Sequence, residues 1–191
     1  MFYTRLLSPF RFLARLRLRA PGNRCSAPSY AVSGGEDGVR TLAARGKRTL
    51  VGETFFQAAT RLRGPLGLVL VEDHGAPREW TSADEGRAVI LEALLQLRDL
   101  LGRGGMDVGL FSAVEGVELF LDRFGSLDVR CVSWRESEMR RILDGLGFRR
   151  VPRISVVPSP DRDRTPWSPE DHSRFARVRN ELGMQLRRTA G

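Results

Sequence analysis

Residues 107–147, DVGLFSAVEGVELFLDRFGSLDVRCVSWRESEMRRILDGLG, contain a weak internal repeat that decides the predicted fold. Four positions of the first copy return 21 residues later in the second, namely Asp107-Val108, Ser112 and Glu115 as Asp128-Val129, Ser133 and Glu136. Each copy has the pattern of a strand, a Ser-x-x-Glu helix cap, a helix with one apolar face and a terminal glycine. The repeat predicts strands at 107–112 and 128–133 and helices at 114–124 and 135–146.

The flanking sequence extends the same alternation. Residues 66–71 form an apolar run typical of a buried strand, residues 83–102 have the apolar spacing of a long helix with a capping box at Ser82 and Glu85, and residues 148–157 predict a last strand. Strands that alternate with helices favour a parallel sheet. We therefore expect a single α/β domain with a three-layer-like arrangement, in which helices cover a mostly parallel sheet of about four strands.

Composition divides the chain into four predicted segments. Residues 1–35 form a basic leader, residues 36–48 a flexible basic lead-in, residues 49–157 the α/β domain, and residues 158–191 a linker and a C-terminal basic helix. Ser168-Pro169 predicts where that last helix begins, since serine is a favoured N-cap and proline a favoured first helical residue.

The leader has the features of a mitochondrial transit peptide. It holds six arginines, no acidic residue and many Phe and Leu residues, which suits an amphipathic import helix. A secretory signal or a membrane anchor needs a long uninterrupted apolar run, and the arginines break every such run. A basic arm for nucleic acid usually has fewer bulky apolar residues. The leader predicts import into the mitochondrial matrix, with cleavage between Cys25 and Gly35, and the chain shows no transmembrane segment.

The charge of the remaining chain is unevenly distributed. Without residues 1–35 the chain has 25 basic and 23 acidic residues. Residues 39–63 and 148–191 each carry a net charge of +5, and residues 64–147 carry −6. Two basic flanks of this kind permit contacts with RNA or with an acidic partner protein, although charge runs are usually only a solvated surface. The candidate contact residues are Arg45, Lys47, Arg48, Arg174, Arg177, Arg187 and Arg188.

Candidate catalytic groups are few. Glu72-Asp73-His74-Gly75 follows a predicted strand, where a histidine beside carboxylates is able to act as a general base, but no nucleophile accompanies it and a polar loop is the simpler interpretation. The Ser-x-x-Glu pairs have the spacing of helix caps. Two histidines and the single Cys131 left after cleavage exclude a histidine-rich or thiolate metal site. We predict no catalytic residue, no metal and no cofactor.

The tryptophans Trp80, Trp134 and Trp167 have two interpretations. An exposed tryptophan stacks on nucleic acid bases, whereas a buried one anchors a loop to the core. The sequence favours the anchoring role.

One segment resembles a known family. Residues 127–157, LDVRCVSWRESEMRRILDGLGFRRVPRISVV, look like the closing strand-helix-strand of the GNAT acyltransferases, in which a helix ends in Gly-Phe, here Gly147-Phe148. The resemblance implies an acyl-CoA cleft, but Arg61-Leu62-Arg63-Gly64-Pro65-Leu66 matches only the first half of that family's pyrophosphate loop.

Two function classes follow. The first is a non-catalytic matrix protein that serves as a subunit or accessory factor of a larger assembly, such as the mitochondrial ribosome or another ribonucleoprotein particle. The alternative is a GNAT-like acyl-CoA-dependent N-acyltransferase. A respiratory-complex subunit shares every feature of the first class except RNA contact.

Overall fold

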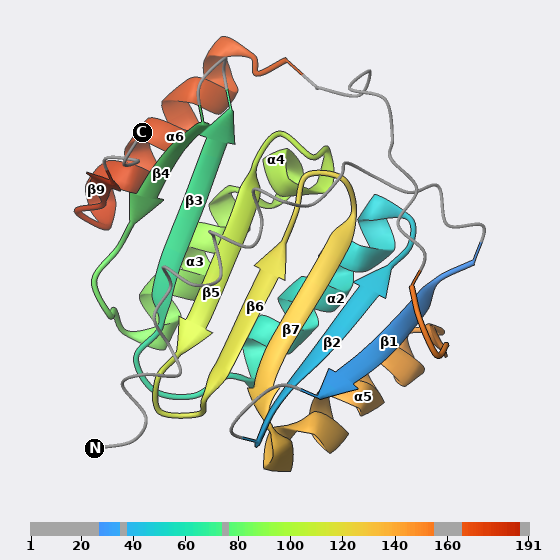
Figure 1. The fold of residues 1–191 in the computed structure, drawn as a ribbon. Helices are drawn as coiled ribbons and strands as arrows, with labels where there is room; N and C mark the ends of the chain where they lie inside the picture. Colours follow the sequence, from blue (N-terminus) through green and yellow to red (C-terminus); the bar gives the residue numbers. More distant parts are fainter. Residues whose placement is uncertain (1–26, 35–37, 74–76, 155–165, 188–191) are drawn as a thin grey trace.

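A nine-stranded sheet forms the centre of the protein (Figure 1). The computed structural model describes residues 27–34, 38–73, 77–154 and 166–187. The strands lie in the order β8-β1-β2-β7-β6-β5-β3-β4-β9. In chain order, the elements are β1 (Ser29–Gly34), β2 (Val39–Arg45), α2 (Arg48–Arg61), β3 (Gly67–Asp73), β4 (Pro77–Thr81), α3 (Arg87–Gln96), α4 (Arg98–Gly102), β5 (Asp107–Ser112), β6 (Val117–Leu121), β7 (Ser126–Val132), η3 (Ser133–Arg135), α5 (Glu136–Gly145), β8 (Arg149–Arg150), α6 (Pro169–Glu181) and β9 (Gln185–Arg187).

The sheet is mostly antiparallel, so the prediction of a mostly parallel sheet of about four strands is wrong. Among the described strands only β1 and β8 pair in parallel, over two residues each. The physical reason is burial on both faces. All five residues of β6 are buried, and continuous apolar runs of this kind are typical of parallel strands covered on both sides.

The segment 114–124 shows this error most clearly, because it was expected to be a helix. The structure instead places a turn at 113–116 and then β6, so that β5, β6 and β7 form an antiparallel meander. Strand geometry sends alternate side chains to opposite faces. The core takes Val117, Leu119 and Leu121, while Glu118 and Phe120 lie on the other face. Because apolar residues occupy both faces of this strand, their spacing also fits one face of a helix, which explains the wrong prediction.

Several individual elements match the sequence. The predicted strands at 66–71, 107–112 and 128–133 correspond to β3, β5 and β7, and the predicted helix at 135–146 corresponds to α5. The last helix, α6, begins after Ser168 as predicted, with a capping box between Ser168 and Asp171.

None of the other three predicted caps, at Ser82, Ser112 and Ser133, forms at a helix end. Ser82 lies away from a helix end, where its Oγ accepts a hydrogen bond from the Leu68 amide at 2.9 Å. The helix expected at 83–102 is divided at Leu97 into α3 and α4, and the N-cap of α3 is Gly86. At α5 the N-cap is Arg135, which makes no side-chain capping bond.

The folded part begins earlier than the predicted start near Thr49. Strand β1 lies within the predicted leader, beyond Cys25, and β2 within the predicted lead-in. Tyr30 of β1 is 1% exposed, and its hydroxyl donates to Asp144 Oδ1 at 2.8 Å. Of the strand predicted over 148–157, the described residues 148–154 contain only β8, and residues 1–26 of the leader lie outside the described residues.

The helices lie on one side of the sheet (Figure 1), where one apolar core joins the two layers. Phe55 of α2, Leu94 of α3, Leu143 of α5 and Phe175 of α6 are all buried in it. Within the described part of the chain, every helix is too short or too polar to cross a membrane.

The opposite face carries ion pairs, and no described helix covers it (Figure 1). Four arginines pair with four carboxylates across neighbouring elements, as Arg45–Asp128, Arg130–Glu118, Arg123–Asp107 and Arg187–Glu79. Burial raises the pKa of Glu118 and of Asp107, although the adjacent guanidinium group lowers it in each case. Three of the pairs join neighbouring strands and help to hold the register of the sheet, while Arg123 lies in the turn between β6 and β7.

Candidate functional site: a charged groove between three helices

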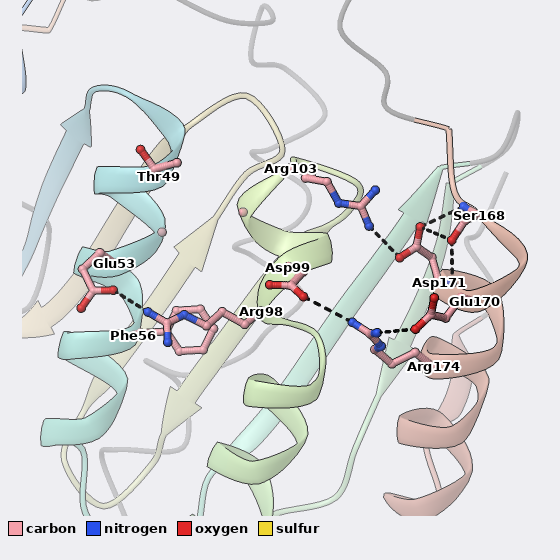
Figure 2. Close-up of a pocket in the computed structure, with 12 residues that line it drawn as sticks. Thr49, Glu53, Phe56, Arg98, Asp99, Arg103, Ser168, Glu170, Asp171 and Arg174 are labelled. Atoms are coloured by element: carbon pink, nitrogen blue, oxygen red, sulfur yellow. Dashed lines mark hydrogen bonds and ion pairs between the residues drawn. The ribbon is translucent and has the colours of Figure 1, made fainter.

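A groove with a volume of about 770 Å³ lies between α2, α4 and α6, on the helical side of the molecule (Figure 2). Each helix contributes side chains from a different part of the sequence. The residues discussed below are Gly52, Glu53 and Phe56 of α2, Arg98, Asp99, Gly102 and Arg103 of α4 and its C-terminal end, and Glu170, Asp171 and Arg174 of α6.

Glycines keep the groove open. A Cβ atom built at Gly52 or at Gly102 meets no other heavy atom within 4 Å. Glycine in the middle of a helix costs stability relative to alanine, so Gly52 gives α2 no structural advantage. Phe56, one turn further along α2, is half-buried, and the Arg98 guanidinium lies 5.4 Å from the centre of its ring. The floor of the groove is therefore small and apolar.

An ion pair joins α2 to α4 across the groove. Arg98 Nη2 lies 2.9 Å from Glu53 Oε2, and both side chains are about half exposed (Figure 2). Exposed pairs of this kind contribute little to stability, so this pair serves chiefly to fix the position of the two charges.

A second pair joins α4 to α6. Arg103 Nη2 lies 2.7 Å from Asp171 Oδ1, and Asp171 also completes the capping box with Ser168. Burial by itself raises the pKa of Asp171, but hydrogen bonds from Ser168 and the ion pair with Arg103 together outweigh burial, so the pKa lies below its usual value. Asp171 is thus held as a carboxylate.

Arg174 completes the set of cations. Its guanidinium group contacts Glu170 at 2.9 Å and Asp99 at 3.6 Å (Figure 2). All three arginines of the lining are therefore held by carboxylates, and the lining has four acidic side chains against three arginines. The groove is therefore not suited to binding a polyanion such as RNA.

The structure brings two of the predicted contact residues together. Arg174 lines the groove, and Arg48 lies beside it, since Arg48 Nη1 donates to the Arg103 carbonyl oxygen at 2.6 Å. The two basic flanks of the sequence thus meet at one groove. Lys47, the N-cap of α2, is exposed.

The other predicted contact residues lie elsewhere. Arg45 is 6% exposed and lies 3.7 Å from Asp128 on the opposite face of the sheet. Arg177 is exposed on α6 and reaches Glu181 at 4.0 Å, and Arg187 pairs with Glu79 at the sheet edge. Arg188 lies outside the described residues. A role for these residues in partner contact stays a prediction.

The catalytic candidates are placed in structural roles or lie beyond the described residues. Glu72 is buried and accepts a hydrogen bond from Trp80 Nε1 at 2.9 Å, and His74 belongs to a segment that is not described. The Glu115 amide donates to Ser112 Oγ at 3.3 Å, in the turn between β5 and β6. Burial raises the pKa of Cys131 to about 12, which keeps its thiol protonated. Across the described ranges no cluster of ligands suits a metal ion.

The three tryptophans differ in exposure. Trp167 is 9% exposed and donates to the Gly105 carbonyl oxygen at 2.8 Å, and Trp80 packs against the core. Both act as anchors. Trp134 is 61% exposed and does not.

Sequence reasoning missed Glu53, Phe56 and Arg98 as members of a site. The ion pair between Arg98 and Glu53 joins residues 45 positions apart, and Arg98 also contacts Phe56, so no local spacing reveals these contacts. One signal was available, because Gly52 interrupts an otherwise regular helical pattern, and an internal glycine often has a packing or functional reason.

The GNAT-like segment does not contribute to the groove. Residues 127–154 form β7, η3, α5 and β8, and β1 and β2 lie between β7 and β8 in the sheet. None of the groove residues belongs to this segment. Comparison with protein-family models, with curated protein sequences and with solved structures finds no match for this chain.

Proposed function

We propose that this chain is a non-catalytic mitochondrial matrix protein that serves as a subunit or accessory factor of a larger assembly, such as the mitochondrial ribosome or another ribonucleoprotein particle. The groove between α2, α4 and α6 carries this proposal, because it suits a polypeptide segment of a partner protein. A partner segment with both basic and acidic side chains would find carboxylates and arginines of opposite charge along the groove, and its apolar side chains would contact Phe56. Support for the matrix location comes from the composition of residues 1–35.

RNA contact within the assembly is assigned to a different surface. The exposed residues Lys47, Arg149, Arg150 and Arg153 lie toward the β8 edge of the sheet, where the Arg149 amide donates to the Pro28 carbonyl oxygen and Gly46 lies beside Pro28. Among the described residues no carboxylate forms an ion pair with these four. Arginines that have no carboxylate partner in the described part of the chain are suited to phosphate contacts.

Sedimentation of the native protein in mitochondrial lysate, with and without ribonuclease, tests the proposal. We expect migration in a large particle. A particle that collapses with ribonuclease supports a ribonucleoprotein, and one that resists ribonuclease supports a protein-only assembly. Migration near the mass of a free monomer or dimer would overturn the proposal.

Two variants test the groove itself. A Cβ atom at Gly52 meets no other heavy atom within 4 Å, and Gly52→Leu also removes a helix-weakening glycine. We expect this variant to occupy the groove and to release the protein from the particle without lowering its stability to urea. The exchange Glu53→Arg with Arg98→Glu keeps an ion pair but reverses its direction, and is expected to have the same effect. Gly145→Leu on α5 is the matched control, since a Cβ there also meets open space. Particles that retain both groove variants would show that the groove is not the docking site.

A further inference from the structure

A second surface lies beyond the C-terminal end of β7, away from the groove, and is formed by the turn at 113–116 and by η3. Val114 in the turn is 72% exposed and Trp134 in η3 is 61% exposed, which makes them the two most exposed large apolar side chains of the described part of the chain. The backbone joins these elements, because the Val132 amide donates to the Gly116 carbonyl oxygen at 3.1 Å. We call Val114, Glu115, Trp134, Arg135 and Glu138 the Trp134 patch.

Arg135 holds the tryptophan in place. Its two terminal nitrogens donate to Glu115 and to Glu138, and its guanidinium carbon lies 4.7 Å from the centre of the Trp134 ring. The side chain of Arg135 is only 13% exposed. One face of the indole is thus supported by a fixed cation while the ring stays exposed, so little conformational freedom remains to be lost when a partner packs on it.

The buried ion pair between Arg135 and Glu115, which lies beside Trp134, is not an arrangement that selection for stability alone would favour. Glu115 is 6% exposed, and its Oε2 atom, like Nε of Arg135, is buried with no hydrogen-bond partner in the described ranges. A buried ion pair that leaves polar atoms unsatisfied is often less stable than an apolar replacement. Two carboxylates around one guanidinium group also leave the patch with a net negative charge.

We propose that the Trp134 patch binds a segment of a partner protein that presents an aliphatic side chain to Trp134 and Val114 and a lysine or arginine to the carboxylate of Glu138, which is the more exposed of the two carboxylates. Tryptophan and arginine are the residue types most enriched among the residues that dominate binding energy at protein interfaces. Nucleic acid bases also stack on exposed tryptophan, but the excess carboxylate repels phosphates. This patch shares no residue with the groove, so the two sites succeed or fail separately.

Titration of the purified full chain with two short synthetic peptides and one RNA tests the assignment. The peptides are acetyl-GRLLRG-amide and its acidic counterpart acetyl-GELLEG-amide, and the RNA is an oligouridylate of about ten nucleotides, which is long enough for several stacked bases. The indole N–H resonance of Trp134, assigned with the Trp134→Phe variant, reports binding. We expect a saturable shift with the basic peptide only. Isothermal titration calorimetry, which needs no tryptophan signal, compares the variants, and we expect the affinity for the basic peptide to be about tenfold or more weaker in Trp134→Ala.

Three results would overturn the assignment. These are a Trp134 shift with the oligouridylate and not with the basic peptide, equal binding of the two peptides, or no shift with either peptide. Leu95→Ala is the matched control, because Leu95 is also an exposed apolar residue, at 58%, on the distant helix α3. If Leu95→Ala weakens binding as much as Trp134→Ala does, the peptide adsorbs to apolar surface in general and the patch is not a site. Urea midpoints show whether each variant remains folded.

Discussion

The two faces of the sheet are built by different means. The face under the helices is filled by aliphatic and aromatic side chains, and the opposite face is crossed by ion pairs between neighbouring strands. Strand β6 contributes to both, since Leu119 joins the core while Glu118 pairs with Arg130 of β7. The apolar face supplies the stability of the fold, whereas the charged face fixes which strands pair and in which register.

Leu119→Ala tests the apolar face and is expected to have the largest effect. Leu119 is 1% exposed, and truncating a leucine in a packed core removes buried surface and leaves a cavity, at a cost of about 2–5 kcal/mol in the free energy of unfolding. Thr41→Ala, on the ion-paired face of β2, is the control and is expected to change stability by less than about 1 kcal/mol. Urea unfolding of both variants measures the difference. Similar values for the two would remove the distinction between the faces.

Glu118→Ala tests the charged face. The change removes the Glu118 carboxylate that lies 2.8 Å from Arg130 Nη1 in a mostly buried position, and is expected to cost about 1–3 kcal/mol. Replacing both partners, as Glu118→Leu with Arg130→Met, is expected to be neutral within about 1 kcal/mol, because no unpaired charge remains. A double-mutant cycle from urea unfolding gives the coupling. A double variant less stable than Glu118→Ala would mean that the pair is a main source of stability.

The difference between the two faces of the sheet also explains which elements of the fold the sequence predicts and which it does not. Strands β3, β5 and β7 and helices α5 and α6 were predictable, because their apolar spacing or capping residues are local features. Strand direction was not, because β6 is buried on both faces and its sequence lacks the alternation of a half-exposed antiparallel strand. The Ser-x-x-Glu pairs also misled, since Ser112 bonds the Glu115 amide in a turn and not at a helix end.

The groove was predictable only in part. The sequence predicts that basic residues near Arg48 and near Arg174 make contacts, but not that Arg48 bonds the end of α4 while Arg174 lines the groove. It also gives no sign that each arginine of the groove is held by a carboxylate, because Arg103–Asp171 joins residues 68 positions apart. Charge composition finds the cations, and only the fold shows how they are neutralised.

Ser168→Ala tests the N-cap of α6, one of the helices that cover the apolar face of the sheet. The Ser168 hydroxyl accepts from the Asp171 amide at 3.1 Å, so its loss is expected to lower the free energy of unfolding by about 1 kcal/mol. Ser133→Ala is the matched control. It removes a serine with the same predicted capping pattern but no side-chain cap at α5, and a change within about 0.5 kcal/mol is expected. Equal losses in urea unfolding would show that Ser133 caps α5 after all.

The smallest expected effect is on the pH dependence of stability. The charged sheet face and the groove should differ in it, because the pKa of Glu118 is raised and the pKa of Asp171 is lowered. Because burial outweighs the attraction of Arg130, the pKa of Glu118 is raised above the ordinary glutamate value of 4.5, and the folded protein binds this proton more tightly than the unfolded chain does. Glu118 therefore contributes more to stability as the pH falls through its folded pKa toward 4.5. Asp171 has a lowered pKa, so its contribution is complete above 3.8 and is lost only as the pH falls below that value.

Urea unfolding of the unmodified protein and of Glu118→Gln, from about pH 7 to about pH 4.5, measures the first contribution. Glutamine has no proton to bind, so the unmodified protein is expected to gain stability relative to Glu118→Gln as the pH falls. Asp171→Asn is the counterpart in the groove, and its difference from the unmodified protein is expected to stay constant over this range. A Glu118→Gln difference that is constant or shrinks toward acid pH would mean that Arg130 outweighs burial, and the charged face would then stabilise the fold as the apolar face does.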